Sequence, residues 1–394
     1  MGKAKRRDFL WIVLFLIVFI NGFEAGGYQA SLWSIGKDFD LSMTSMGLYA
    51  AMELFATMLA PILLGRWADS VEKSKSIGIM LGIQIVAAIL VLFTASDIVF
   101  LGGVFFLGLT TSALQFIAIA ALADAYPVSG GRKVAYMTSM YATGALIAPQ
   151  VVDLYLRQGL HWRTLFGILA AGSILCFAGI LACGSKPREE KPAADAFSAG
   201  ASAFILPAIL LLGVIMCIYV GFENGFTFFV DTLFTDVLKA DTGKLALSLF
   251  WAVMIPSRLL VGRFSVHAKK ILIISILAIP CAMLLLAASS NPTLVLCLCV
   301  PLGFASGAIY PSVLTLLLPL AGKRTATATG IITSATGIGG VVFTALTGFL
   351  SDRIGMQAAM LVLVSFFAIS LICAIAVIRM DGKRTAASSR PEST

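Results

Sequence analysis

The sequence Gly22-Phe23-Glu24-Ala25-Gly26 places a carboxyl group inside an apolar run that extends from Phe9 to about Trp33 and is long enough to cross a bilayer. The same pattern returns as Gly221-Phe222-Glu223-Asn224-Gly225, inside another such run. A charged residue at the centre of an isolated membrane-spanning helix costs roughly 2.5–3.5 kcal/mol. Its presence at the same place in each half of the chain predicts a duplicated protein with its working site between the halves.

The composition indicates a polytopic membrane protein. Of the 394 residues, 59% are hydrophobic and 12% are charged, whereas soluble chains carry about 25% charged residues. The first apolar run is too long for a cleavable signal peptide, and no small-residue cleavage site follows it. A spanning helix needs about 20 apolar residues, and we predict an all-α protein with twelve such helices, over approximately 9–34, 44–66, 76–95, 98–123, 133–156, 163–184, 204–235, 245–264, 270–289, 293–320, 325–350 and 356–379.

The basic residues predict the topology. If the N-terminus lies in the cytoplasm, most of the 28 Lys and Arg residues fall in cytoplasmic segments, and those left outside are Lys37, Arg157, Arg163, Lys239, Lys244 and Arg353. The positive-inside rule then predicts a multi-pass protein of the inner (cytoplasmic) membrane with both termini in the cytoplasm. Because these residues are scattered over short loops, the net charge of +8 does not indicate nucleic-acid binding.

The chain divides into two predicted six-helix bundles. They cover residues 1–184 and 203–380, with a cytoplasmic linker at 185–202 and a polar cytoplasmic tail at 381–394 that we expect to be disordered. Besides the two glutamates, several short motifs recur, and their offset falls slowly along the chain: Gly65-Arg66 with Gly262-Arg263, and Leu107-Gly108 with Leu302-Gly303. Parallel six-helix repeats are typical of one class of secondary transporter.

The whole-chain pattern resembles the major facilitator superfamily. Gly65, Arg66, Asp69 and Lys73 fit the family's signature G-x-x-x-D-x-x-x-[R/K] between the second and third helices, although Glu72 stands where a second glycine is usual. Asp69 is placed to accept hydrogen bonds at a neighbouring helix N-terminus and to pair with a nearby base. We expect these residues to form a cytoplasmic gate; the alternative is a solvated loop acid.

A second motif resembles one of the family's antiporters. Gly144, Ala148 and Pro149 in the fifth helix are similar to the sequence G-x-x-x-G-P, with Ala148 in place of a glycine. This resemblance implies two pseudo-symmetric bundles that transport by alternating access. It also implies the bacterial proton-coupled efflux branch of the family.

The intramembrane acids are the strongest candidates for function. Glu24 lies about 15 residues from the cytoplasmic end of its helix, and Glu53 lies about 9 residues from the outer end of the next helix. Because a helix rises about 1.5 Å per residue, the two side chains are expected at nearly the same depth in the membrane. Polar stripes beside such acids avoid lipid and line a cavity or a helix interface. The alternative is that the carboxyl groups are structural. The predicted proton-coupling and substrate residues are Glu24, Glu223, Glu53, Asn21, Tyr28, Asn224, Thr227, Gln115, Gln150, Tyr310 and Trp251.

Three further polar residues are weaker candidates for function. Asp231 lies near the outer surface, where we expect it to be solvated, and Gln84 lies on a helix that is peripheral in the resembled fold. No Lys or Arg occupies the middle third of a span, and Arg258, about five residues from a helix end, is the nearest. Anionic ligands need Arg or Lys, so the sequence favours cations, protons or neutral polar solutes as cargo.

Catalysis and cofactor binding are not expected. The sequence has no phosphate-binding loop for ATP, and its cysteines and its two histidines, His161 and His267, do not have metal-ligand spacing. We predict a monomeric transporter without cofactors, whose partners are a small-molecule substrate, protons and the bilayer. The first hypothesis is proton-coupled export of a cationic or neutral compound. The alternatives are proton-coupled import of a neutral polar solute such as a sugar or nucleoside, divalent-metal transport, and a non-transporting membrane sensor.

Overall fold

The computed structural model describes residues 9–125, 130–183, 204–321 and 325–388, and the regular structure of these residues is helical. Eleven of the helices in this part are long and apolar enough to cross a membrane. The remaining predicted span, 133–156, is also a helix, α6 (Gly130–Arg157), with a less apolar composition. The predicted linker at 185–202 lies outside the described residues.

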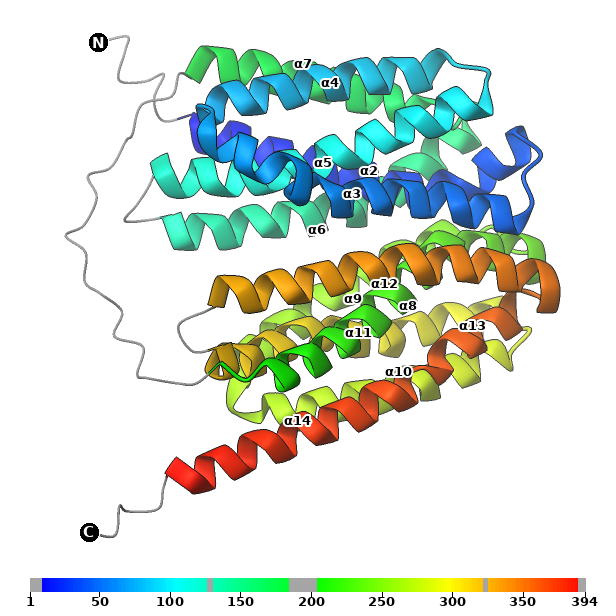
Figure 1. Cartoon of the computed structure of the whole chain (residues 1–394). Helices are drawn as coiled ribbons and strands as arrows, with labels where there is room; N and C mark the ends of the chain where they lie inside the picture. The colour runs from blue at the N-terminus through cyan, green and yellow to red at the C-terminus, as the bar shows by residue number, and fades with distance from the viewer. Residues whose placement is uncertain (1–8, 126–129, 184–203, 322–324, 389–394) are drawn as a thin grey trace. The chain divides into compact units, whose positions relative to one another are not determined.

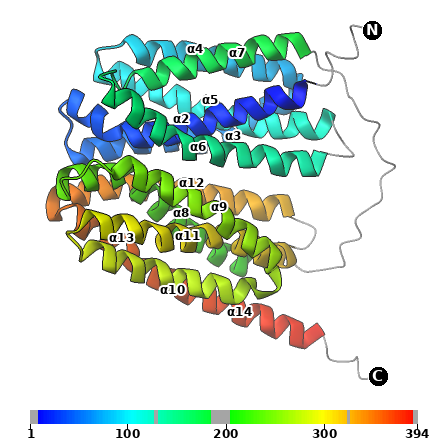
Figure 2. The ribbon, with the colours of Figure 1, turned by 180° about the vertical axis from the view of Figure 1, so that it is seen from behind.

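The chain folds as two units, residues 1–196 and 197–394, each packed mainly against itself. In the first unit α2 packs against α6 and α7, while α5 packs against α3 and α4 (Figures 1 and 2). The unit contains the long helices α2 (Leu10–Asp38), α3 (Met43–Ser70), α4 (Lys73–Phe93), α5 (Asp97–Ala125), α6 and α7 (Thr164–Cys183).

The second unit repeats these packing partners. Its first helix, α8, packs against α12 and α14, and α11 packs against α9 and α10 (Figure 2). The helices are α8 (Leu206–Thr232), extended by a π-helical turn at Leu233–Val237, then α9 (Gly243–Arg263), α10 (Ala268–Ala287), α11 (Pro292–Ala321), α12 (Thr325–Ile354), α13 (Met356–Ser365) and α14 (Phe367–Ser388). The expectation of a disordered tail from residue 381 is wrong as far as Ser388, because α14 continues through these residues; 389–394 lie outside the described part.

Two capping side chains and one glycine mark boundaries between helices. The Ser42 hydroxyl accepts a hydrogen bond from the Ser45 amide at 3.2 Å and caps the start of α3. The Asn291 carboxamide oxygen accepts from the Thr293 amide at 3.0 Å and does the same for α11. Gly355 has a φ of 83°, which side-chain-bearing residues rarely adopt, and it separates α12 from α13.

Glycines allow the first helix of each unit to approach its neighbour at backbone distance. A Cβ atom at Gly22 would lie 2.0 Å from the Tyr141 carbonyl oxygen of α6, and one at Gly144 would lie 2.2 Å from the Phe19 carbonyl oxygen of α2. In the second unit a Cβ atom at Gly339 of α12 would lie 2.0 Å from the Cys217 carbonyl oxygen of α8. Small residues at helix interfaces permit this packing in membranes, so the glutamate-bearing helices are closely held in both units.

Ion pairs fix the ends of helices in each unit. Asp231 on α8 is 2% exposed and pairs with Lys244 on α9 at 2.9 Å. The expectation that Asp231 is solvated is therefore wrong: the turn after α8 returns the chain so that Lys244 covers the carboxylate. In the first unit Asp38 accepts from Arg163 at 3.1 Å and from the Trp162 indole at 3.2 Å, which links α2 to the start of α7.

Candidate functional site

Glu24 lies in a buried polar network in the first unit. The Thr111 hydroxyl of α5 donates to the Glu24 carboxylate at 3.5 Å. The Gln84 amide of α4 donates to Thr111 Oγ1 at 3.4 Å and to Asn21 Oδ1 at 3.2 Å, and the Ser173 hydroxyl of α7 donates to Gln84 Oε1 at 3.2 Å. The network therefore connects four helices, α2, α4, α5 and α7, and ends at a carboxyl group.

A second carboxyl group faces the first. Glu53 on α3 is 5% exposed and interacts electrostatically with Glu24, and the Tyr28 side chain interacts with both. The Glu53 Oε2 atom is buried and has no hydrogen-bond partner among the described residues. No Lys or Arg side chain in the described part acts on Glu24 or Glu53. The sequence-based placement of these two acids near one another is in agreement with this geometry.

Gln84 is more central than its sequence position indicated. It is fully buried and takes part in three of the hydrogen bonds, and Thr111 was not singled out at all. An amide in the middle of an apolar helix is a detectable signal, because an unpaired polar group there is costly. Because this helix was expected to be peripheral, the possibility that one of its sides faces the other helices was not considered.

Gln84→Leu is expected to destabilise the protein by about 1–2 kcal/mol, because it leaves Asn21 Oδ1 and the Ser173 hydroxyl unpaired in an apolar surrounding. Thermal unfolding of the purified protein in detergent measures the effect. Gln115→Leu is the matched control: Gln115 is half-buried on α5 and has no side-chain hydrogen bond in the described structure. Equal stability of the two variants would contradict a structural role of the network.

The second unit contains a cluster of opposite charges. Glu223 and Tyr219 lie one turn apart on α8 and are 8% and 1% exposed. Arg258 of α9 interacts electrostatically with Glu223, Tyr219 and Tyr310, the last from α11. From the sequence, Arg258 was only the base nearest to the middle of a span, and its interaction with Glu223 was missed. The Cα–Cβ bond of a helical residue tilts toward the helix N-terminus, so Arg258 extends away from the nearby end of α9.

Two of the remaining predicted cavity residues, Asn224 and Thr227, form hydrogen bonds within their own helix. Asn224 is half-buried and donates to the Val220 carbonyl of its own helix at 2.9 Å, and Thr227 donates to the Asn224 carbonyl at 3.3 Å. Gln115 and Trp251 are half-buried, whereas Gln150 is exposed. Their role in a substrate cavity stays a prediction.

The structure describes the motif in α6 more fully than the motif between α3 and α4. Lys73 donates to the Ala68 carbonyl at 2.7 Å and so closes the C-terminal end of α3. The side chains of Arg66 and Asp69 lie outside the described part, and an added Cβ at Gly65 would meet open space. In α6, Gly144, Ala148 and Pro149 are buried, and Gly144 forms the close contact with α2. The gate and the antiporter role stay predictions.

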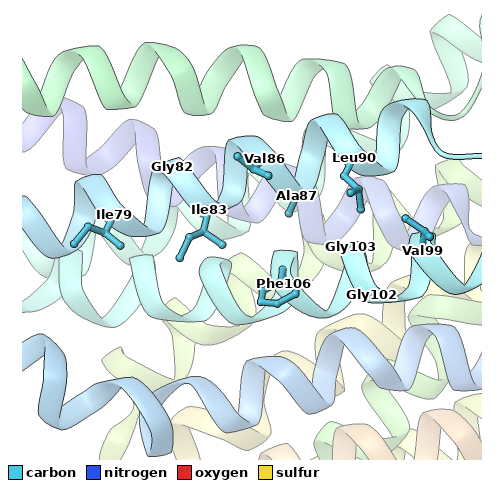
Figure 3. A pocket seen from close by; sticks show the side chains of 10 residues that line it. All are labelled: Ile79, Gly82, Ile83, Val86, Ala87, Leu90, Val99, Gly102, Gly103 and Phe106. Atoms are coloured by element: carbon cyan, nitrogen blue, oxygen red, sulfur yellow. The ribbon is translucent and has the colours of Figure 1, made fainter.

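An apolar groove of about 620 Å³ lies between α4 and α5. Figure 3 shows Ile79, Ile83, Val86 and Leu90 of α4 around it, with Val99 and Phe106 of α5 opposite. Its lining includes none of the predicted site residues and no charged side chain. On helices apolar enough to span a membrane, such a surface suits contact with lipid, and it is distinct from the polar network around Glu24.

The comparisons with known proteins agree with the two-unit helical architecture. The model of the Major Facilitator Superfamily matches residues 14–344 and 268–393. The chain belongs to the major facilitator superfamily. No curated protein sequence matches it.

Solved structures of this superfamily share the fold. A bacterial homolog of the human lysosomal transporter Spinster, in an inward-facing and unoccupied conformation, is 16% identical, with 100% of each chain covered and a TM-score of 0.80. The nucleoside transporter NupG is 14% identical, with 94% of this chain and 99% of that chain covered and a TM-score of 0.73. At such identities the likeness concerns the fold, and membership of the superfamily makes the protein a multi-pass membrane protein and a secondary transporter.

Proposed function

We propose that the protein is a proton-coupled secondary transporter that exports a cationic or neutral small organic compound, and that Glu24 and Glu53 hold the coupling proton. The observation that carries this proposal is the pair of buried, mutually interacting carboxyl groups without a basic partner in the described structure. Two close carboxylates without a counter-ion repel each other, and sharing a proton relieves the repulsion. Proton relays in transporters use acids of this kind.

The surroundings of Glu24 support a change of protonation state. Thr111 donates to Glu24, so this carboxyl group has a donor that stabilises its charged form. Glu53, whose Oε2 atom has no partner in the described part, has a site for a proton or a cationic group. A cation that competes with the proton for these carboxylates would produce exchange without further groups.

A second candidate function is import of a neutral polar solute together with a proton. The observation that favours it is the Glu223–Arg258 cluster, in which opposite charges offset each other. Such a cluster offers donors and acceptors without net charge, which suits a neutral solute. The two candidates differ in the direction in which substrate and proton move.

Everted membrane vesicles separate the two directions. The lumen is acidified by respiration, a pH-sensitive dye reports the gradient, and compounds from a library of organic cations, sugars and nucleosides are added outside. An exporter that exchanges substrate for protons is expected to release protons from the lumen, so the gradient collapses. Further acidification of the lumen would establish symport instead. No response to any compound in vesicles from cells that express the protein would contradict proton coupling.

A further inference from the structure

The Glu223–Arg258 cluster, which includes Tyr219 and Tyr310, contains charged groups that are not directly paired. The carboxylate and the guanidinium interact electrostatically but form no direct salt bridge in the described structure. The Tyr219 hydroxyl faces both groups, is buried, and has no hydrogen bond of ordinary geometry with a described residue. The Tyr219 hydroxyl thus interacts with both charged groups, while the carboxylate and the guanidinium form no salt bridge with each other in the described structure.

The cluster is also open on one side. Arg258 is exposed and Tyr310 is 37% exposed, whereas Glu223 and Tyr219 are buried. A guanidinium within a membrane-spanning helix almost always faces protein or a water-filled path. A solute that reaches this path therefore meets Arg258 and Tyr310 first, with Glu223 and Tyr219 behind them.

Charge balance restricts what the cluster accepts. A solute with a single negative charge would occupy Arg258 and leave Glu223 as an uncompensated buried charge, and a single positive charge on Glu223 would leave the Arg258 guanidinium without its partner. Leaving one member of a buried charge pair without its partner is strongly unfavourable. A solute that carries both charges replaces the mutual attraction on each side and leaves neither group unpaired.

We propose that this cluster binds a zwitterionic, net-neutral solute, with its anionic group on Arg258 and its cationic group on Glu223. Arginine forms two parallel hydrogen bonds with a carboxylate or phosphate, and the Tyr219 hydroxyl completes the contact with either group. The inference rests on the proposed transport function, because it selects, within the neutral compounds, the class that the protein carries.

Binding of matched probes tests the charge requirement. Glycine, β-alanine, 4-aminobutyrate and phenylalanine vary the distance between charges and the size of the solute. Their methyl esters carry only the positive charge, and their N-acetyl derivatives carry only the negative charge. We expect at least one zwitterion to bind the purified full-length protein in isothermal titration calorimetry at least 10-fold more tightly than its ester and its N-acetyl derivative. Equal binding of the three forms, or no binding by any probe, overturns the proposal.

Single-charge variants test the assignment of each end. Glu223→Gln leaves Arg258 alone and is expected to shift the preference toward the N-acetyl derivative, whereas Arg258→Gln is expected to shift it toward the methyl ester. The double variant keeps the cluster neutral, which controls for loss of folding, and is expected to lose the preference for zwitterions. If the single variants weaken all three forms by the same factor, the charges do not contact the solute and the proposal is wrong.

The result is separable from the test of proton coupling. If the wild-type protein shows no preference for zwitterions but responds to the pH gradient, only the zwitterion site is overturned. A normal charge preference without any coupling to protons overturns only the proposed function of Glu24 and Glu53. Both readouts use the full-length protein, in everted vesicles for the pH gradient and purified for calorimetry.

Discussion

Replacing Glu24 with glutamine is expected to abolish transport driven by a pH gradient while the protein remains folded. Glutamine keeps the shape of the side chain and can still accept the hydrogen bond that Thr111 donates at 3.5 Å. It cannot bind and release a proton, however, so the pair with Glu53 loses the group that we propose as the coupling site. Gradient-driven flux in proteoliposomes should fall below detection, whereas exchange of substrate at equal pH on both sides should continue.

Two further substitutions sharpen this result. Glu223→Gln is expected to reduce flux by a smaller factor, because Arg258 already offsets that carboxylate. Glu72→Gln is the matched control, since Glu72 precedes α4 at the surface and its side chain forms an exposed ion pair with Lys75 at 3.4 Å. Full gradient-driven flux in both the Glu24→Gln and Glu223→Gln proteins would mean that neither acid couples transport and that both are structural.

The fold could be predicted from the sequence because its main determinants are local. Apolar runs of sufficient length define the spans, and the repeated Gly-Phe-Glu pattern marks the first helix of each unit, α2 and α8. Depth along a helix also follows from counting residues, which is why Glu24 and Glu53 were expected to be near neighbours.

The composition of the candidate site was harder to predict, because counting residues says nothing of which side of one helix faces the next. Gln84 contacts Asn21 and Ser173 only because α4 turns this face toward α2 and α7. Arg258 approaches Glu223 because of the direction of its side chain on α9. These relations depend on helix packing, which a single sequence does not specify.

Gly22→Ala is expected to cause the largest loss of stability, about 3 kcal/mol, because the added methyl group meets backbone and not a movable side chain. Its Cβ atom would lie 2.0 Å from the Tyr141 carbonyl oxygen and 2.7 Å from the Tyr141 Cα atom. Rotating a side chain cannot relieve this overlap, so α2 must move away from α6, and overpacking of this kind typically costs about 1–3 kcal/mol, occasionally more. The movement would also displace Glu24, two residues further along, from Thr111.

The chain provides matched controls for this substitution in the same unit. A Cβ atom at Gly82 of α4 or at Gly102 of α5 would meet no atom within 4 Å. Gly82→Ala and Gly102→Ala should therefore leave the thermal unfolding temperature in detergent unchanged or raise it, because alanine favours the helix over glycine by up to about 1 kcal/mol. Gly22→Ala should unfold at a clearly lower temperature than either. If it unfolds with them, the contact between α2 and α6 is looser than the backbone distances indicate.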